Sequence, residues 1–337
     1  MLGLVVAIIA ILIFACAGLA YERRGERRDA IRFPPPGRLV EAGNAQRLHI
    51  HVTGAGGPTV VLESGIAATS LSWALVQPAV AQFSTVCSYD RAGLGWSDTT
   101  SAVPTAAGIA RELRTLLRNA QLPGPYILVG HSFGGLAAQR FAALYRNDVS
   151  GLVLVDPLAA SEWYPFRDER EKMLRRGLSL SRRGAVLARF GVVRACLSML
   201  MGGGRFAPRL AGRLASGRGG SGFMDRIAGQ IRKLPQQTWP AIAAHWCNPR
   251  SFETMARYLE SLPESAEEMC ALDVLDVPAT VITGGKNPGV AQDPAPLLPH
   301  AKRIVAQHSG HWVQLDEPSI VIGAIRELVE KARRDSI

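Results

Sequence analysis

The sequence predicts an α/β protein with a mostly parallel sheet covered by helices on both faces, a helical insertion and an N-terminal transmembrane helix. Three observations predict this architecture. Short apolar runs typical of buried strands alternate with helical patterns, which favours parallel strands joined by helical crossovers. The alternation stops once, between Leu158 and about Cys270, where no strand-like run occurs. The first twenty residues contain no charged side chain.

Length and composition are those of one large globular domain with additions. The chain has 337 residues, of which 47% are hydrophobic and 20% charged, so a sizeable core can be buried. The five cysteines are scattered, with no CxxC motif and no neighbouring histidine cluster. This pattern indicates neither a disulfide framework nor a metal site.

The positive charge of the chain is concentrated in one segment. The formal net charge is +10, and residues 158–235 alone hold 16 Lys and Arg against 5 Asp and Glu. The rest of the chain is therefore close to neutral. No zinc-finger, RNA-recognition or basic-zipper pattern accompanies the basic segment, so we expect no nucleic-acid partner.

Residues 1–21 are predicted to form a transmembrane helix. At about 1.5 Å per residue the uncharged run reaches roughly 30 Å, the thickness of a bilayer core. The alternative is a cleaved signal covering residues 1–20, with a small-residue site at Ala15-Cys16-Ala17 or Ala17-Gly18-Leu19-Ala20. The absence of Lys and Arg before the run, and the length of the run, favour a retained anchor.

The charges that flank this helix predict its orientation. Arginines follow the span and none precedes it; they are Arg23, Arg24, Arg27, Arg28 and Arg32. By the positive-inside rule the following domain faces the cytoplasm. Removal of the segment as a signal would instead give a secreted or periplasmic protein. Residues 22–37 are charged and end in Pro34-Pro35-Pro36, which predicts an extended stalk.

The core domain is predicted over residues 38–156 and 271–337, with a helical cap at 157–270. Leu39–Glu41 and Arg47–Val52 flank a Gly-Asn turn and predict a hairpin. Further strands are predicted at Thr59–Leu62, Thr85–Tyr89, Tyr126–Val129, Gly151–Val155, Ala279–Thr283 and Ile304–Val305. Helices are predicted at Leu71–Ala81, Thr105–Ala120, Phe133–Tyr145 and Pro318–Arg333. A cap inserted between two strands is expected at the carboxyl edge of the sheet, where such sheets bind ligands.

A glycine-rich turn contains the candidate nucleophile. The apolar strand Tyr126–Val129 runs into Gly130-x-Ser132-x-Gly134, and a helical pattern follows. A serine on such a sharp turn points its hydroxyl away from the sheet, and the crowded backbone leaves no space for side chains two residues away on either side. The N–H of Phe133, at the start of the helix, can stabilise an oxyanion. The spacing differs from that of dinucleotide and phosphate loops.

With this turn the chain resembles the α/β-hydrolase family, over residues 38–156 and 272–333. Leu62-Glu63-Ser64-Gly65-Ile66 occupies the place where family members carry a second oxyanion donor, and the resemblance implies the Ile66 N–H. Asp90-Arg91-Ala92-Gly93-Leu94-Gly95-Trp96-Ser97 is similar to a turn of the family that we interpret as structural.

The candidate general base is His311. Ser309-Gly310-His311-Trp312 resembles the histidine loop of the family, follows the last strand and precedes a helix. It can therefore reach the edge of the sheet where Ser132 stands. The order of serine before histidine is the order of this fold's catalytic triad. The other six histidines have no comparable setting.

The sequence leaves three alternatives for the acid of the triad. In most relatives an Asp follows the strand that corresponds to Pro278–Thr283, but here the turn is Gly284-Gly285-Lys286-Asn287. An amide cannot supply the charge that stabilises an imidazolium. Asp156 is the best substitute, because some relatives, haloalkane dehalogenases and pancreatic-type lipases among them, take the acid from this strand end. Asp293 is a second candidate, and a site without an acid is the third.

The resemblance implies a serine hydrolase that cleaves carboxylic ester or related acyl bonds, as esterases and lipases do, without a metal or an organic cofactor. A serine nucleophile argues against the dehalogenases and epoxide hydrolases of the family, which use Asp. Three alternatives stay open: an inactive binding protein, a cofactor-free haloperoxidase or acyltransferase, and a basic scaffold at a membrane surface. An apolar series between Val186 and Leu200 is interleaved with arginines. It predicts a cap helix that packs on the core, or one that lies on an anionic leaflet and admits lipophilic acyl substrates.

Overall fold

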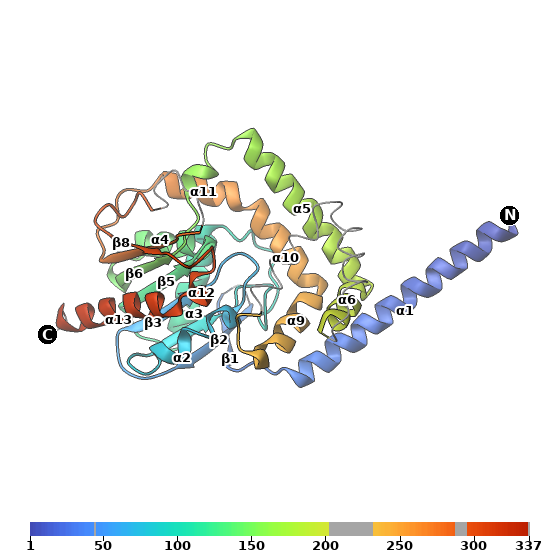
Figure 1. Ribbon diagram of the computed structural model, residues 1–337, viewed down its shortest axis with the longest axis horizontal. Coiled ribbons are helices and arrows are strands. Elements are labelled where there is room, and N and C mark those ends of the chain that lie inside the picture. Colours follow the sequence, from blue (N-terminus) through green and yellow to red (C-terminus); the bar gives the residue numbers. More distant parts are fainter. Residues whose placement is uncertain (44, 202–231, 287–294, 336–337) are drawn as a thin grey trace. The chain divides into compact units, whose positions relative to one another are not determined.

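The computed structural model describes residues 1–43, 45–201, 232–286 and 295–335, which form two compact units (Figure 1). The helical unit comprises Met1–Pro34, Arg175–Arg232 and Gln236–Ala256. The sheet unit comprises Pro35–Leu174, Lys233–Pro235 and Arg257–Ile337. The predicted cap at 157–270 is thus divided: its central part belongs with the N-terminal helix, and both ends belong with the sheet.

The sheet unit contains an eight-stranded, mostly parallel sheet, as predicted. Its strands are β1 (Arg38–Glu41), β2 (Arg47–Thr53), β3 (Thr59–Glu63), β4 (Val86–Tyr89), β5 (Tyr126–His131), β6 (Val149–Val155), β7 (Ala279–Gly284) and β8 (Lys302–Ala306). They follow the order β1-β2-β4-β3-β5-β6-β7-β8. The β1–β2 and β2–β4 pairs are antiparallel, which confirms the N-terminal hairpin, and all other pairs are parallel.

Helices cover both faces of this sheet, because successive residues of each buried strand point to opposite sides. Leu128 of β5 belongs to the core under α3 (Ala106–Asn119) and α4 (Phe133–Leu144). Its neighbours Ile127 and Val129 belong to the core under α2 (Gln77–Val80) and α13 (Pro318–Asp335). Both faces of β5 are therefore buried, so its apolar residues follow one another without a polar residue between them, as in other parallel strands covered on two sides.

The helix predicted at 71–81 is wrong in its extent. The segment forms a 3₁₀ turn at Ser70–Trp73 and then the short α2. Proline is tolerated only in the first turn of a helix, because it lacks an N–H and its ring clashes with the preceding turn. Pro78 stands within the first two residues of α2, so the helix begins anew there.

The C-terminal end of the predicted cap packs on the sheet unit through helix α11 (Leu262–Cys270). The first N–H groups of α3 have no partner within their own helix. Ala106 N–H donates to the Ser265 hydroxyl at 3.1 Å, and Ala107 N–H donates to the Glu268 carboxylate at 2.9 Å. These bonds explain why this end of the cap belongs with the sheet.

The N-terminal helix α1 extends further than predicted, from Leu2 to Arg32. Residues 22–32, predicted as the charged part of a stalk, continue the helix. The apolar window of α1 has a mean hydropathy of 3.0 and is not buried, and α1 is the one helix of the described residues that is long and apolar enough to cross a membrane. The region after the window is different, because Glu22 and Gly25 are buried.

A buried ion pair joins α1 to helix α6 (Val192–Met201) within the helical unit. Arg194 donates to both Glu22 carboxylate oxygens, at 2.7 and 2.9 Å, and also to Asp29. The side chains of Arg194 and Glu22 are 5% and 3% exposed. A Cβ atom at Gly25 would lie 2.2 Å from Arg194 Nε, so the glycine makes room for the guanidinium. The unit also contains most of α5 (Asp168–Arg189), α9 (Trp239–Cys247) and the first part of α10 (Pro249–Glu260).

We predict that Arg194→Met destabilises the helical unit by about 3–5 kcal/mol, because it leaves the Glu22 carboxylate buried without a partner. The control is Arg189→Met, which removes an ion pair to Glu253 whose side chains are 60% and 42% exposed, and exposed pairs contribute about 0–1 kcal/mol. Urea unfolding of the full chain in detergent measures both. Equal losses in the two variants would contradict a special role of the buried pair.

Candidate active site

The backbone of Ser132 has the strained conformation of a sharp strand-to-helix turn. Ser132 lies between β5 and α4 with φ 54° and ψ −121°, a region that is costly for a residue with a side chain. A Cβ atom at Gly130 would lie 2.5 Å from the Gly134 carbonyl oxygen, and one at Gly134 would lie 2.6 Å from the carbonyl oxygens of Glu63 and Ser64. Both positions therefore require glycine. The Ser132 side chain itself is partly exposed.

The structure brings Asp156 and His311 together. Asp156 directly follows β6, and its Oδ2 lies 2.7 Å from His311 Nδ1. Its other oxygen, Oδ1, accepts the N–H of Gly284 at the end of β7, at 2.9 Å. The Asp156 side chain is 9% exposed and that of His311 is 43% exposed. A carboxylate bound to Nδ1 leaves Nε2 of His311 as the basic nitrogen.

Two features hold the histidine loop at the carboxyl edge of the sheet. A Cβ atom at Gly284 would lie 2.2 Å from the Gly310 carbonyl oxygen, so the loop lies directly on the end of β7. Asp316 Oδ2 accepts from Gly310 N–H at 3.1 Å and from Ser309 Oγ at 3.2 Å, and Lys233 pairs with Asp316. Burial would raise the pKa of Asp316, but these bonds outweigh it and the pKa is lowered.

His131 connects the turn of Ser132 with the loop of His311. Its Nε2 lies 2.9 Å from the His311 carbonyl oxygen, and the two imidazole rings are 4.7 Å apart between centroids. Ser132 and His311 therefore lie at the same edge of the sheet. In the described part of the chain the Ser132 hydroxyl makes no hydrogen bond, and such contacts often tighten only when substrate is bound.

The His131 imidazole is neutral at physiological pH. Burial lowers its pKa well below the ordinary value, and the nearby His311 adds to this effect. Since the His311 carbonyl oxygen can only accept, Nε2 of His131 carries the proton. The sequence does not predict this role, because His131 occupies a position of the serine turn at which any residue is allowed.

The two candidate oxyanion donors belong to segments that lie next to Ser132. Phe133 is the first residue of α4, so its N–H is free of the helix. Ile66 follows β3 in a turn that is closed by Ala68 N–H and the Gly65 carbonyl oxygen, 3.3 Å apart. A Cβ atom at Gly65 would lie 3.4 Å from Ser132 Cβ, so this turn lies against the serine.

Arg91 supports the Ile66 turn from beneath. Its Nη2 donates to the carbonyl oxygen of Gly65, which belongs to the same peptide unit as the Ile66 N–H. The guanidinium is buried between aromatic rings, 5.4 Å from the centroid of Phe133 and 4.6 Å from that of Tyr258. Arg91 therefore fixes the direction in which the Ile66 N–H points.

A buried carboxylate compensates the charge of Arg91. Glu63 Oε1 lies 3.6 Å from Arg91 Nε, and Glu63 also accepts the Tyr89 hydroxyl. Burial raises the pKa of Glu63, and the guanidinium and the hydroxyl oppose this shift. Asp90 has the structural role predicted for this segment, because it accepts the N–H groups of Ser70 and Trp96 at 2.7 and 3.1 Å. The contact of Arg91 with Gly65 was missed, since no local pattern shows which carbonyl an arginine reaches.

Asp293, the second predicted candidate for the acid, lies outside the described residues, as does Asn287, which stands where most relatives carry the acid. Within the described residues, no group of three His, Cys, Asp or Glu side chains is arranged to hold a metal ion.

Comparison with known proteins agrees with this geometry. Residues 58–318, most of the chain, match the sequence model of the α/β-hydrolase fold. The chain belongs to the α/β-hydrolase family. This α/β-hydrolase is 35% identical over 107 residues to the uncharacterized protein YqjL of Bacillus subtilis, covering 32% of this chain and 42% of that protein. It is 32% identical over 126 residues to an AB hydrolase superfamily protein of Gibberella zeae, covering 35% and 39%. The matches thus span less than half the length of these curated relatives.

Solved structures of the same fold include enzymes of different specificity. The α/β-hydrolase superposes on the epoxide hydrolase CorEH with a TM-score of 0.65 at 18% identity, covering 88% of this chain and 98% of that one. It superposes on a thermophilic esterase from Thermogutta terrifontis with a TM-score of 0.61 at 22% identity, covering 87% and 98%. These similarities show the fold, and the family includes hydrolases.

The buried His131 predicts a pH dependence of stability. An unfolded histidine binds a proton below about pH 6.5, whereas the lowered pKa keeps folded His131 neutral. The free energy of unfolding therefore decreases as the pH falls from about 6.5 toward the folded pKa, by about 1.4 kcal/mol per pH unit. The variant His131→Gln can still donate to the His311 carbonyl oxygen but does not titrate.

Urea unfolding between about pH 5 and 7 should therefore show a smaller loss of stability at low pH for His131→Gln than for the wild type. His300→Gln, at an exposed position, is the matched control and should follow the wild type. Parallel curves for wild type and His131→Gln would mean that His131 is protonated in the folded state.

Proposed function

We propose that this α/β-hydrolase is a membrane-anchored serine hydrolase that cleaves carboxylic ester or related acyl bonds. Ser132 is the nucleophile, His311 the general base and Asp156 the acid of the triad. The observation that carries the proposal is the 2.7 Å hydrogen bond between Asp156 and His311 at the edge of the sheet where Ser132 stands. A paired carboxylate removes the main reason to regard the site as inactive.

The first half of the reaction forms an acyl-enzyme. Ser132 Oγ attacks the carbonyl carbon of the substrate while His311 Nε2 takes the hydroxyl proton, and Asp156 stabilises the resulting imidazolium. The negative charge on the former carbonyl oxygen is held by the N–H groups of Phe133 and Ile66. When the tetrahedral intermediate collapses, the bond to the leaving oxygen breaks and His311 returns the proton to the alcohol.

The second half releases the acid. His311 takes a proton from water, the hydroxide attacks the acyl carbon, and Ser132 leaves with the proton from the imidazolium. These steps need no metal or organic cofactor. An acyl acceptor other than water would make the same intermediate an acyltransferase intermediate, so product analysis with and without an added alcohol separates hydrolysis from transfer.

The anchored state is also part of the proposal. Cleavage near Ala17 or Ala20 would cut α1 just before the turns that pack on α6, and the continuous helix supports retention. The arginines that follow the span support a cytoplasmic catalytic domain. A substrate with a lipophilic acyl group suits an enzyme held at a bilayer, and p-nitrophenyl esters of increasing chain length test this preference.

A fluorophosphonate probe tests the nucleophile, because it phosphonylates only an activated serine. We expect labelling of the wild type and none of Ser132→Ala. Equal labelling of both proteins would remove Ser132 from the mechanism.

Esterase kinetics test the acid of the triad. Asp156→Asn should lower kcat about 10⁴-fold, as the corresponding change does in serine proteases, because an amide favours the wrong imidazole tautomer. The control is Asp148→Asn, at a partly exposed ion pair with Arg114, which should retain activity. If Asp156→Asn keeps the wild-type kcat, another residue supplies the acid.

We further predict that Arg91 is a positioning residue for the oxyanion. Arg91→Met, combined with Glu63→Gln so that no buried charge is left unpaired, should lower kcat with little change in KM. The loss should stay below the roughly 10²–10³-fold that removal of an oxyanion donor costs. Binding of an alkyl trifluoromethyl ketone, which mimics the tetrahedral intermediate, should weaken in parallel.

Arg114→Met is the matched control for Arg91, because this guanidinium also stacks on a tyrosine, Tyr145, at 4.2 Å. A purely structural Arg91 would lower the melting temperature and leave the affinity for the trifluoromethyl ketone unchanged.

A further inference from the structure

We propose that the corner between α5 and α6 lies in the headgroup region of the bilayer that α1 crosses. The helical unit would then contact the membrane surface, with Val186 and Phe190 in contact with lipid. This proposal rests on the retained anchor and not on the chemistry at Ser132.

Contacts with α1 give the depth of the corner. A Cβ atom at Gly18 would lie 2.6 Å from the Phe190 carbonyl oxygen, and one at Gly191 would lie 2.6 Å from Tyr21 Cδ1. Gly191 has φ +72°, which allows the sharp turn between the two helices. Gly18 and Tyr21 mark the end of the uncharged run of α1, which is where the hydrocarbon core meets the headgroups. The corner between α5 and α6 therefore lies at the boundary between the hydrocarbon core and the headgroups.

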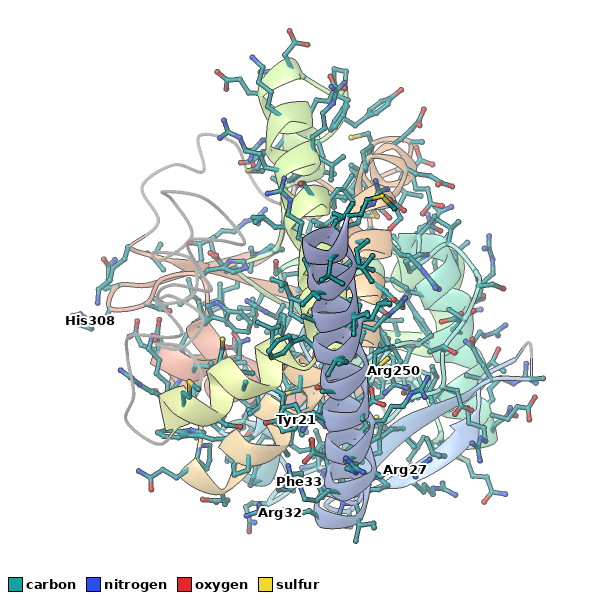
Figure 2. The ribbon with its side chains drawn as sticks, turned by 90° about the vertical axis from the view of Figure 1, so that its right-hand side faces the viewer. Tyr21, Arg27, Arg32, Phe33, Arg250 and His308 are labelled. Carbon is teal, nitrogen blue, oxygen red and sulfur yellow. The ribbon has the colours of Figure 1, made fainter. Side chains whose placement is uncertain are left out.

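The attachment of the corner to α1 is stiff. The residues of α1 that face the corner and α6 recur at helical spacing and are Gly18, Glu22, Gly25 and Asp29. Arg194, one turn after the corner, is held by both carboxylates of this stripe. Because a buried, doubly bonded guanidinium has few alternative conformations, the corner cannot move far along the helix. Figure 2 looks onto this part of α1, with Tyr21 and Arg27 labelled along the helix.

The surface of the corner has the composition of a membrane-interface helix. Val186, in the last turn of α5, is 56% exposed, and Phe190, which directly follows the helix, is 36% exposed. Arginines 182 and 183 precede them on the exposed side of the same helix. Apolar side chains beside arginines, at the end of a membrane span, fit the boundary between acyl chains and anionic headgroups. The occupant of this surface is therefore lipid.

Spin labels on the full chain in nanodiscs of phosphatidylcholine and phosphatidylglycerol test the depth. The exposed Cys16 and Cys270 are replaced by Ser, and single labels are placed at Val186→Cys, Ser179→Cys and Ile8→Cys. Ser179 is exposed on α5, about two turns or roughly 10 Å before Val186, so it serves as the matched control. Ile8 lies in the apolar run of α1 and reports whether the anchor is in the bilayer.

Relaxation by oxygen, which concentrates in lipid, is compared with relaxation by a water-soluble nickel chelate. We expect the ratio of oxygen to nickel accessibility at position 186 to be severalfold higher than at 179 and lower than at position 8, which lies deeper in the bilayer. Gly18→Leu, which forces the Phe190 carbonyl away from α1, should lower the ratio at position 186.

Three outcomes would overturn the proposal, and they can be told apart. A ratio at position 186 equal to that at 179, with a lipid value at position 8, means that the anchor spans the membrane while the corner stays in water. A low ratio of oxygen to nickel accessibility at position 8, typical of a label in water, means that α1 does not cross the bilayer. A label at 186 that is shielded from both reagents indicates a protein neighbour and also contradicts lipid contact.

Discussion

A hydrogen bond between the Asp156 carboxylate and the His311 imidazole joins the end of β6 to the loop after β8. The bond directs Nε2 of His311 away from the carboxylate, and the second Asp156 oxygen is held by the end of β7. The carboxylate is therefore fixed on both sides. The proposed chemistry depends on this arrangement, since an imidazole without a buried acceptor at Nδ1 would adopt either tautomer.

Close backbone packing brings the remaining groups to the same edge. Gly134 lets the nucleophile turn approach the end of β3, and Gly284 lets the histidine loop approach the end of β7. In both places a methyl group would overlap a carbonyl oxygen. Arg91 adds a buried charge beside the Gly65–Ile66 turn, and its bond to the Gly65 carbonyl polarises the peptide whose N–H is the proposed oxyanion donor. Charge and steric exclusion thus organise one edge of one sheet.

The helical unit is likewise held together by close approaches at glycines and by a buried charge. Glycines at 18 and 25 let α6 and its preceding corner approach α1, and the Arg194 guanidinium fills the space above Gly25. The pairing with Glu22 and Asp29 explains why α1 continues as a helix beyond its apolar run. Residues that read as a solvated, charged stalk are instead a packed face, because their partners lie more than 160 residues away.

Local patterns were sufficient for the strands, the two-sided core, the serine turn and the histidine loop. Alternation of apolar residues and the steric demand for glycine act over a few neighbouring positions, so they are visible in the sequence around Ser132 and Ile127. The helix before β4 was predicted too long, although the proline that interrupts it, Pro78, is a local signal. By contrast, the choice of Asp156 among the candidate partners of His311, the carbonyl that Arg91 reaches, the role of His131 and the continuation of α1 were decided by the tertiary structure. Each of these depends on which distant backbone or charge lies within hydrogen-bonding distance after the strands have paired, and no local pattern contains that information.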